Sequence, residues 1–413
     1  MKKKSLWAII ALAGLTISSC TNDEVIPNTS ADNAIEFGTY LGRDAQTKSA
    51  ALTSTNLLDF GVFASYTLKN DWSNNASNFM FNQKVQKIDG EWVYTPKKYW
   101  PATKEEKISF FAYAPYSNYD SQPTVKLENV FDNDDTSAPK VNFTISNDVT
   151  KMVDFTAGVV MNKTKTNNTE TDEENTVKFY LKHELTRVNF AAKLDRDAFD
   201  NSDPKHKTKI NITSVKIDKG DDFIASADYT FNTNNNGNLG SWSNPTATTS
   251  DLNLADILNK NEASGLGDYK DQGVLVPTTA EVPLFKTNKY LFLISPNNGQ
   301  GLDKTDVINV TFTYDIITAD VSLNGGYVKS TATKQVKLAT GNSDLIDDDD
   351  DDSTPQVITA PNTLQQGKAY KFTFTFGLHE VKVSAEVTAW SDDTNGGNTS
   401  VDWSDAEPTH SQD

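Results

Sequence analysis

The chain has 413 residues, a formal net charge of −18, one cysteine and four histidines. Nucleic acid and anionic lipid head groups repel so acidic a chain, which argues against both as partners. A single cysteine leaves neither a disulfide framework nor a thiolate zinc site, so stability has to come from apolar burial.

The first twenty residues have the layout of an export signal. Three lysines follow Met1, residues 6–17 are an apolar run, and small residues lead to Cys20. At ~1.5 Å per helical residue the run reaches only ~18 Å, short of the ~30 Å hydrocarbon core. The end of the run resembles the bacterial lipobox, which implies cleavage after residues 1–19 and acylation of Cys20, an outer-membrane anchor. The alternative is an ordinary signal peptide with an incidental cysteine.

Beyond this segment, apolar and polar residues alternate with a period of two, and clusters of Asn, Asp, Gly, Ser and Thr interrupt them. This pattern predicts strands with one buried face, and helical periodicity is scarce. The alternating residues are Ile108, Phe110 and Ala112; Val310, Phe312, Tyr314 and Ile316; Phe372, Phe374 and Phe376; and Val381, Val383, Ala385, Val387 and Ala389. Residues 291–294 are continuously apolar, which favours burial on both faces. These are the components of β-sandwiches.

A domain boundary is expected where the alternation stops. Residues 195–209 bring charges and a proline before a new strand begins at Ile210. We therefore expect an N-terminal β-sandwich domain over 49–200, a C-terminal β-sandwich domain over 201–391 and a polar tail over 392–413.

The run of six aspartates at residues 347–352 predicts a solvated loop, because like charges repel and aspartate has low strand propensity. Calcium binding is the alternative. The run lacks the glycine and the spaced carboxylates of a known calcium loop. No metal site and no cofactor is predicted.

Catalytic motifs are absent from the sequence. The histidines have no metal-ligand spacing, and no nucleophile elbow, phosphate loop or nucleotide fingerprint occurs. His183 has the same parity as Val177, Phe179 and Leu185, which indicates a hydrogen-bonded core histidine. We therefore predict no enzyme; a sandwich hydrolase would need a cluster of groups around His183 or His379.

Nine aromatic residues crowd between positions 92 and 119. Alternating aromatics of this kind are typical of a sandwich core, where each buries ~150 to 250 Å². A sugar-stacking platform is the alternative, with Tyr116 and Tyr119 the best candidates for exposure because they follow Pro115.

Five segments together resemble successive landmarks of the fimbrillin family, the lipoprotein-derived subunits of type V pili. They are YWPATKEEKISFFAYAPY (99–116), MVDFTAG (152–158), VKFYLKHELTRVNF (177–190), YLFLISP (290–296) and GKAYKFTFTF (367–376). The resemblance implies an all-β fold of two tandem β-sandwich domains with transthyretin-like topology. It also implies a cell-surface fimbrial subunit that supports adhesion.

The resemblance further implies assembly by strand exchange. In the family an N-terminal strand fills a groove, a surface protease cuts behind it at an arginine, and the C-terminal strand of a neighbouring subunit replaces it. Within the expected pro-segment, 20–48, alternation suggests a plug strand with the anchors Ile35, Phe37, Tyr40 and Leu41.

Arg43 and Lys48 follow this strand in a polar stretch that a protease can reach. The family usually has an arginine after a threonine where this chain has Thr47 and Lys48. Arg43 is therefore the better cleavage candidate, with cleavage at Lys48 or no cleavage as alternatives.

The expected donor strand is the alternating segment with Val381, Val383, Ala385 and Val387. The tail beyond it is a poor plug, with only Val401 and Trp403 as apolar anchors. A stalk, tip or anchor role remains open. The alternative function is a non-polymerising surface lipoprotein that binds a glycan or a host protein through exposed aromatics.

Overall fold

The structure, a computed structural model, describes residues 33–41, 51–53, 56–73, 77–117, 125–126, 138–165, 175–195, 208–220, 223–232, 239–263, 265–296, 299, 307–340, 364–377 and 381–390. Four predicted features lie outside these residues: the signal with Cys20, the cleavage candidates Arg43 and Lys48, the acidic run 347–352, and the tail 392–413.

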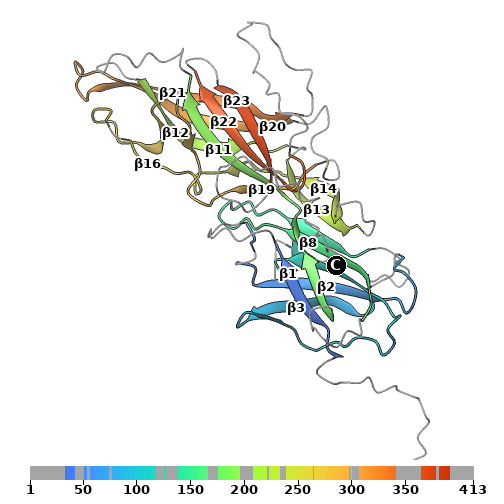
Figure 1. The fold of residues 1–413 in the computed structure, drawn as a ribbon. Coiled ribbons are helices and arrows are strands. Elements are labelled where there is room, and N and C mark those ends of the chain that lie inside the picture. Colours follow the sequence, from blue (N-terminus) through green and yellow to red (C-terminus); the bar gives the residue numbers. More distant parts are fainter. Residues whose placement is uncertain are drawn as a thin grey trace, which may run out of the picture.

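The described residues form twenty-three strands in five sheets and no α-helix, which confirms the all-β class. Figure 1 shows them as an elongated body with β1 to β8 in one half and β20 to β23 in the other. No helix within the described ranges is long and apolar enough to cross a bilayer.

The N-terminal half has three layers. The outer layer is a parallel pair of β1 (Glu36–Tyr40) and β9 (Thr176–Tyr180). The middle layer has the order β10 (Lys182–His183), β8 (Thr156–Lys163), β5 (Ile108–Ala114), β2 (Asp59–Tyr66), β3 (Met80–Ile88) and β4 (Glu91–Val93). The third layer has the order β14 (Gly240–Ala247), β13 (Ile224–Phe231), β7 (Lys140–Thr144) and β6 (Val125–Lys126).

Strand β5 is buried on both faces, whereas the alternation predicted one buried face. Phe110 belongs to the core under β1 and β9, while Phe111 belongs to the core shared with β13, where its ring lies 5.6 Å from that of Phe231. The prediction missed the third layer because the partner of the second face comes from a distant part of the sequence.

The C-terminal half is a sandwich of two sheets. One has the order β18 (Val282–Pro283), β11 (Thr186–Leu194), β22 (Lys368–Phe376) and β23 (Val381–Ala389), with β19 (Leu291–Leu293) also on β11. The other has the order β16 (Asn261–Glu262), β17 (Gln272–Val276), β12 (Thr208–Ile217), β20 (Val307–Ala319) and β21 (Tyr327–Thr340), with β15 (Leu252–Asn253) on β12. The Phe312 and Phe374 rings meet between the sheets at 4.4 Å.

The sheets do not follow the expected limits at residues 200 and 201. Strand β11 precedes that limit and pairs with β22, whereas β13 follows it and pairs with β7. The loss of alternation near residue 200 lies between β11 and β12, which both belong to the C-terminal sandwich. The chain therefore crosses between the two halves more than once.

Candidate functional site

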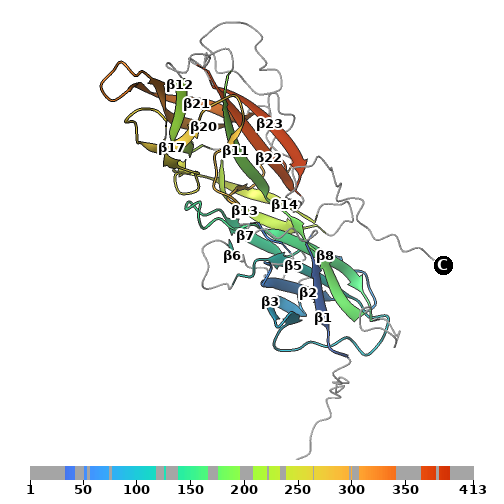
Figure 2. The same cartoon turned by 60° about the vertical axis from the view of Figure 1, so that its left-hand side comes forward.

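The most distinctive feature of the N-terminal half is the outer strand β1. Together with β9 it forms a separate layer over the sheet that contains β2 and β3 (Figures 1 and 2). Its backbone pairs in parallel with β9, from Glu36 opposite Thr176 to Tyr40 opposite Tyr180. No other sheet strand pairs with β1 among the described residues, so this strand has one regular sheet neighbour.

Backbone bonds at each end of β1 fix its register. At its start, the Ile35 amide donates to the Lys98 carbonyl at 2.9 Å, and the Trp100 amide donates to the Asn33 carbonyl at 3.0 Å. At its end, the Leu181 amide donates to the Tyr40 carbonyl at 2.9 Å. These bonds join backbone atoms, so a strand of different sequence could make them too.

Three side chains of the predicted plug strand are buried: Ile35 at 0%, Phe37 at 5% and Leu41 at 1% exposure. The Phe37 ring lies in an aromatic box, with centroids 5.2 Å from Tyr94, 5.9 Å from Phe179, 6.0 Å from Phe110 and 6.2 Å from Phe60. At ~1.5 to 3 kcal/mol for each buried large side chain, the three anchors contribute about 5 to 9 kcal/mol of burial.

The fourth predicted anchor, Tyr40, points outward. It is 43% exposed and its ring lies 5.9 Å from that of Tyr180, which is 51% exposed. The pair therefore covers the outer face of β1 and β9, while the groove itself holds Ile35, Phe37 and Leu41.

Tyr94 connects the aromatic box to the backbone of β1. Its hydroxyl donates to the Ile35 carbonyl at 2.8 Å. Burial raises the pKa of Tyr94 to about 12, so the hydroxyl keeps its proton and remains a donor. Gly158 of β8 makes room on the other side, because a Cβ there would lie 2.9 Å from Leu181 Cδ2. We call the space lined by these residues and occupied by β1 the β1 groove.

The predicted donor residues lie in β23. Its backbone pairs with β22 along nine residues, from Val381 opposite Phe376 to Ala389 opposite Lys368, and includes Val383, Ala385 and Val387. Donation of this segment to a neighbour would break all of these pairs.

A polar junction that was not predicted from the sequence lies between the two halves. His183 is buried, as predicted, and its Nδ1 shares a hydrogen bond of 2.8 Å with Asp154 Oδ2. The same oxygen accepts from the Leu52 amide at 2.9 Å. The His183 ring stacks on Trp390 at 4.1 Å and 6°. Leu52, His183 and Trp390 therefore meet at one place. They come from the segment after the cleavage candidates, the segment between β9 and β11, and the residue after β23. The only sign of this junction in the sequence was the position of His183 on the apolar side of its alternating segment.

Glu184 is the second buried acid at the junction. Burial raises the pKa of its carboxyl to about 8, against 4.5 for an ordinary glutamate. Its Oε2 accepts a hydrogen bond from Gln366, and its backbone carbonyl accepts from Trp242 Nε1 at 2.8 Å. At neutral pH the carboxyl is therefore mostly protonated. Through its side chain Glu184 bonds to Gln366, just before β22, and through its backbone it bonds to β14.

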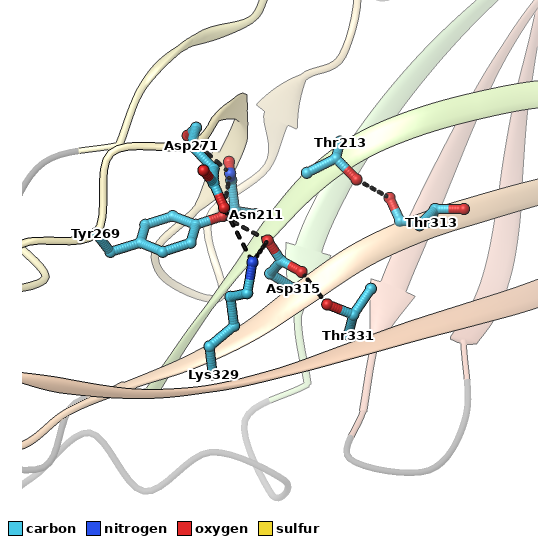
Figure 3. A network of polar contacts seen from close by, with 8 residues as sticks. All are labelled: Asn211, Thr213, Tyr269, Asp271, Thr313, Asp315, Lys329 and Thr331. Carbon is cyan, nitrogen blue, oxygen red and sulfur yellow. Dashed lines mark hydrogen bonds and ion pairs between the residues drawn. The ribbon is translucent and has the colours of Figure 1, made fainter.

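A further polar network lies in the C-terminal sandwich (Figure 3). The Tyr269 hydroxyl donates to Asp315 Oδ2 at 2.7 Å and accepts from Asn211 Nδ2 at 2.7 Å. Thr331 donates to the other Asp315 oxygen at 2.6 Å, and Lys329 Nζ lies 3.0 Å from Asp271. The network ties the segment before β17 to β12, β20 and β21.

Most of the clustered aromatic residues lie in the core, as predicted. Tyr94, Trp100, Phe110, Phe111 and Tyr113 are all at most 5% exposed. Tyr116 is partly buried with Lys84 over its ring, and Tyr119 lies outside the described residues. Within the described ranges, no group of His, Cys, Asp and Glu could hold a metal ion.

Comparison with known proteins places the chain in a family. The model of the Fimbrillin-like family matches residues 47–390, most of the sequence, and the chain belongs to that family. It is 26% identical to the fimbrium subunit Fim1C of Phocaeicola vulgatus ATCC 8482, over 95% of this chain and 98% of the relative. The fold resembles the crystal structure of a fimbrial protein from Bacteroides vulgatus ATCC 8482, with a TM-score of 0.67 and 23% identity over 87% of this chain and 100% of the other.

Proposed function

We propose that the protein is a structural subunit of cell-surface fimbriae that assembles by donor-strand exchange and supports adhesion. The observation that carries this proposal is the β1 groove. Residues 35–41, whose strand β1 has a single sheet neighbour, supply three buried anchors to the core beneath them. Removing it would uncover about 5 to 9 kcal/mol of apolar burial, which a strand from another subunit could restore.

The export route belongs to the same proposal. Acylation of Cys20 holds the precursor at the outer membrane, and a surface protease cuts after Arg43, or after Lys48, to release the segment that contains β1. The N-terminal residue of protein recovered from cell surfaces tests this step. A start at Asp44 or Ser49 supports processing, whereas an exclusive start at acylated Cys20 contradicts it.

Assembly is tested with protein cut after Arg43. We expect concentration-dependent ladders on a gel from cut protein and a monomer from uncut protein, because β1 blocks its own groove until the chain is cut. Cut protein that loses β1, stays folded and stays monomeric at high concentration contradicts the proposal. The Arg43→Gln chain, which an arginine-specific protease leaves intact at this position, is the matched control.

A further inference from the structure

The chain behind the cleavage candidates is docked on the body by a short turn. Asn56 Nδ2 donates to the Ala51 carbonyl at 2.9 Å, and Asn56 Oδ1 accepts from the Thr53 amide at 2.6 Å. Ala51 is 1% exposed and belongs to the core shared with β13, whereas Leu57, also 1% exposed, belongs to the core under β1. We call residues 51–53, 56 and 57 the docked turn.

The docked turn donates a hydrogen bond to a buried carboxylate. The Leu52 amide donates to Asp154 Oδ2 at 2.9 Å, and the Phe155 amide donates to Asp154 Oδ1 at 2.8 Å. Asp154 is 0% exposed, so these donors replace the water that would solvate a surface carboxylate. Because each oxygen accepts from a different backbone amide, the two bonds fix the plane of the carboxylate.

The carboxylate of Asp154 in turn sets the orientation of the His183 ring. The backbone of His183 is held in β10 opposite Thr156 of β8, so the ring changes direction only by rotation of the side chain. The bond of 2.8 Å between His183 Nδ1 and Asp154 Oδ2 fixes that rotation. The ring then lies 4.1 Å from the Trp390 ring and within 6° of its plane, which is the geometry of a close stack.

Trp390 holds the end of β23 through this stack. It follows the last residue of β23 and is 1% exposed, with the Phe292 ring at 5.6 Å and the Arg187 guanidinium at 5.2 Å as further neighbours. Among the described strands, β23 is at the edge of its sheet and pairs with β22 alone. A strand with one paired edge frays more readily than a central strand, so its end depends on such an attachment.

From this series of contacts we infer that the docked turn and the end of β23 are coupled through Asp154 and His183. Docking of the turn orders the carboxylate, the carboxylate orders the His183 ring, and the ring stacks on Trp390. Coupling between two sites is reciprocal, so loss of the Trp390 stack also loosens the turn. The coupling is a property of the folded single chain and does not depend on the proposed strand exchange.

The coupling gives the position of a cut a structural consequence. Arg43 and Lys48 both precede the docked turn, so a cut after either residue separates β1 from the turn and leaves the turn with the body. The contacts from Leu52 to Trp390 then survive the loss of β1. A cut after Leu52 would instead detach the donor of Asp154 from the body and loosen the end of β23.

The test is hydrogen exchange in uncut, full-length chains. Leu52→Pro removes the amide donor and should speed exchange in β23 about tenfold, the effect of about one hydrogen bond to a charged group, with β20 and β21 unchanged. Leu52→Ala, which keeps the amide, is the matched control and should stay within about twofold of the parent. Equal exchange in β23 of Leu52→Pro and of the parent overturns the inference.

Trp390→Leu tests the same coupling from the other end, and decides the question if Leu52→Pro does not fold. It should speed exchange of the Leu52 amide about tenfold, whereas Trp390→Phe, which can still stack on His183, should change it less than about threefold. In a His183→Phe background, which keeps a ring against Trp390 but cannot bond to Asp154, the effect of Trp390→Leu on the Leu52 amide should disappear. An unchanged Leu52 amide in Trp390→Leu, or an undiminished effect in the His183→Phe background, overturns the inference.

Discussion

The two strands nearest the ends of the described chain, β1 and β23, have the same alternating pattern but very different attachments. Strand β1 pairs with β9 over five residues, whereas β23 pairs with β22 over nine residues and is followed by the buried Trp390. Alternation therefore indicates which residues face a core, but pairing decides how readily a strand can leave it. We expect β1 to be removable and β23 to be fixed.

The largest expected effect concerns the anchors of β1. Phe37→Asp would place a carboxylate among four aromatic rings and should lower the free energy of unfolding by about 4 kcal/mol. Tyr40→Asp, on the exposed side of the same strand, should cost less than ~1 kcal/mol. Urea denaturation of both variants measures the difference, and equal losses would show that β1 does not seal the core.

A substitution at the fixed end of β23 should lower the free energy of unfolding nearly as much. Trp390→Ala removes the stack on His183 and on Phe292, whose ring lies 5.6 Å away, and should cost about 3 kcal/mol. Hydrogen exchange should then become faster along β22 and β23 and remain unchanged in β1 and β9. Faster exchange in β1 alone would contradict the assignment of Trp390 to the end of β23.

The junction should also make stability depend on pH. Because the pKa of Glu184 is about 8 when folded and near 4.5 when unfolded, the unfolded chain loses this proton first as pH rises. The free energy of unfolding should therefore fall between these pH values, by up to about 1.4 kcal/mol per pH unit, and level off above pH 8.

Glu184→Gln is the matched variant, since its amide stays neutral throughout. This variant should remove the slope. Asp154, Lys182 and Tyr229 also influence the pKa of Glu184 and remain in the variant. A slope of the same size in Glu184→Gln would assign the pH dependence to other groups.

The smallest expected effect concerns a single hydrogen bond to the strand segment of β1. Tyr94→Phe removes the donor to the Ile35 carbonyl and should cost about 1 kcal/mol. In protein cut after Arg43, it should speed the release of β1 several-fold. Tyr180→Phe, at a half-exposed tyrosine of β9, serves as control and should leave the release rate unchanged.

Several features could be predicted from the sequence because they depend on local patterning. A period of two predicted the all-β class, the burial of Phe372, Phe374 and Phe376, and the continuous burial of residues 291–294. Parity likewise predicted the burial of His183. Each inference needs only the backbone geometry of one strand, which the residues themselves favour.

Other features depend on the tertiary structure. The common parity of residues 177–185 suggested one strand, yet β9 and β10 within this range join two different sheets, because β9 pairs with β1 and β10 pairs with β8. The second buried face of β5 and the junction of Asp154, His183 and Trp390 arise in the same way. The sequence by itself determined which side chains seek a core; only long-range pairing, which no local pattern encodes, decided which core each one enters.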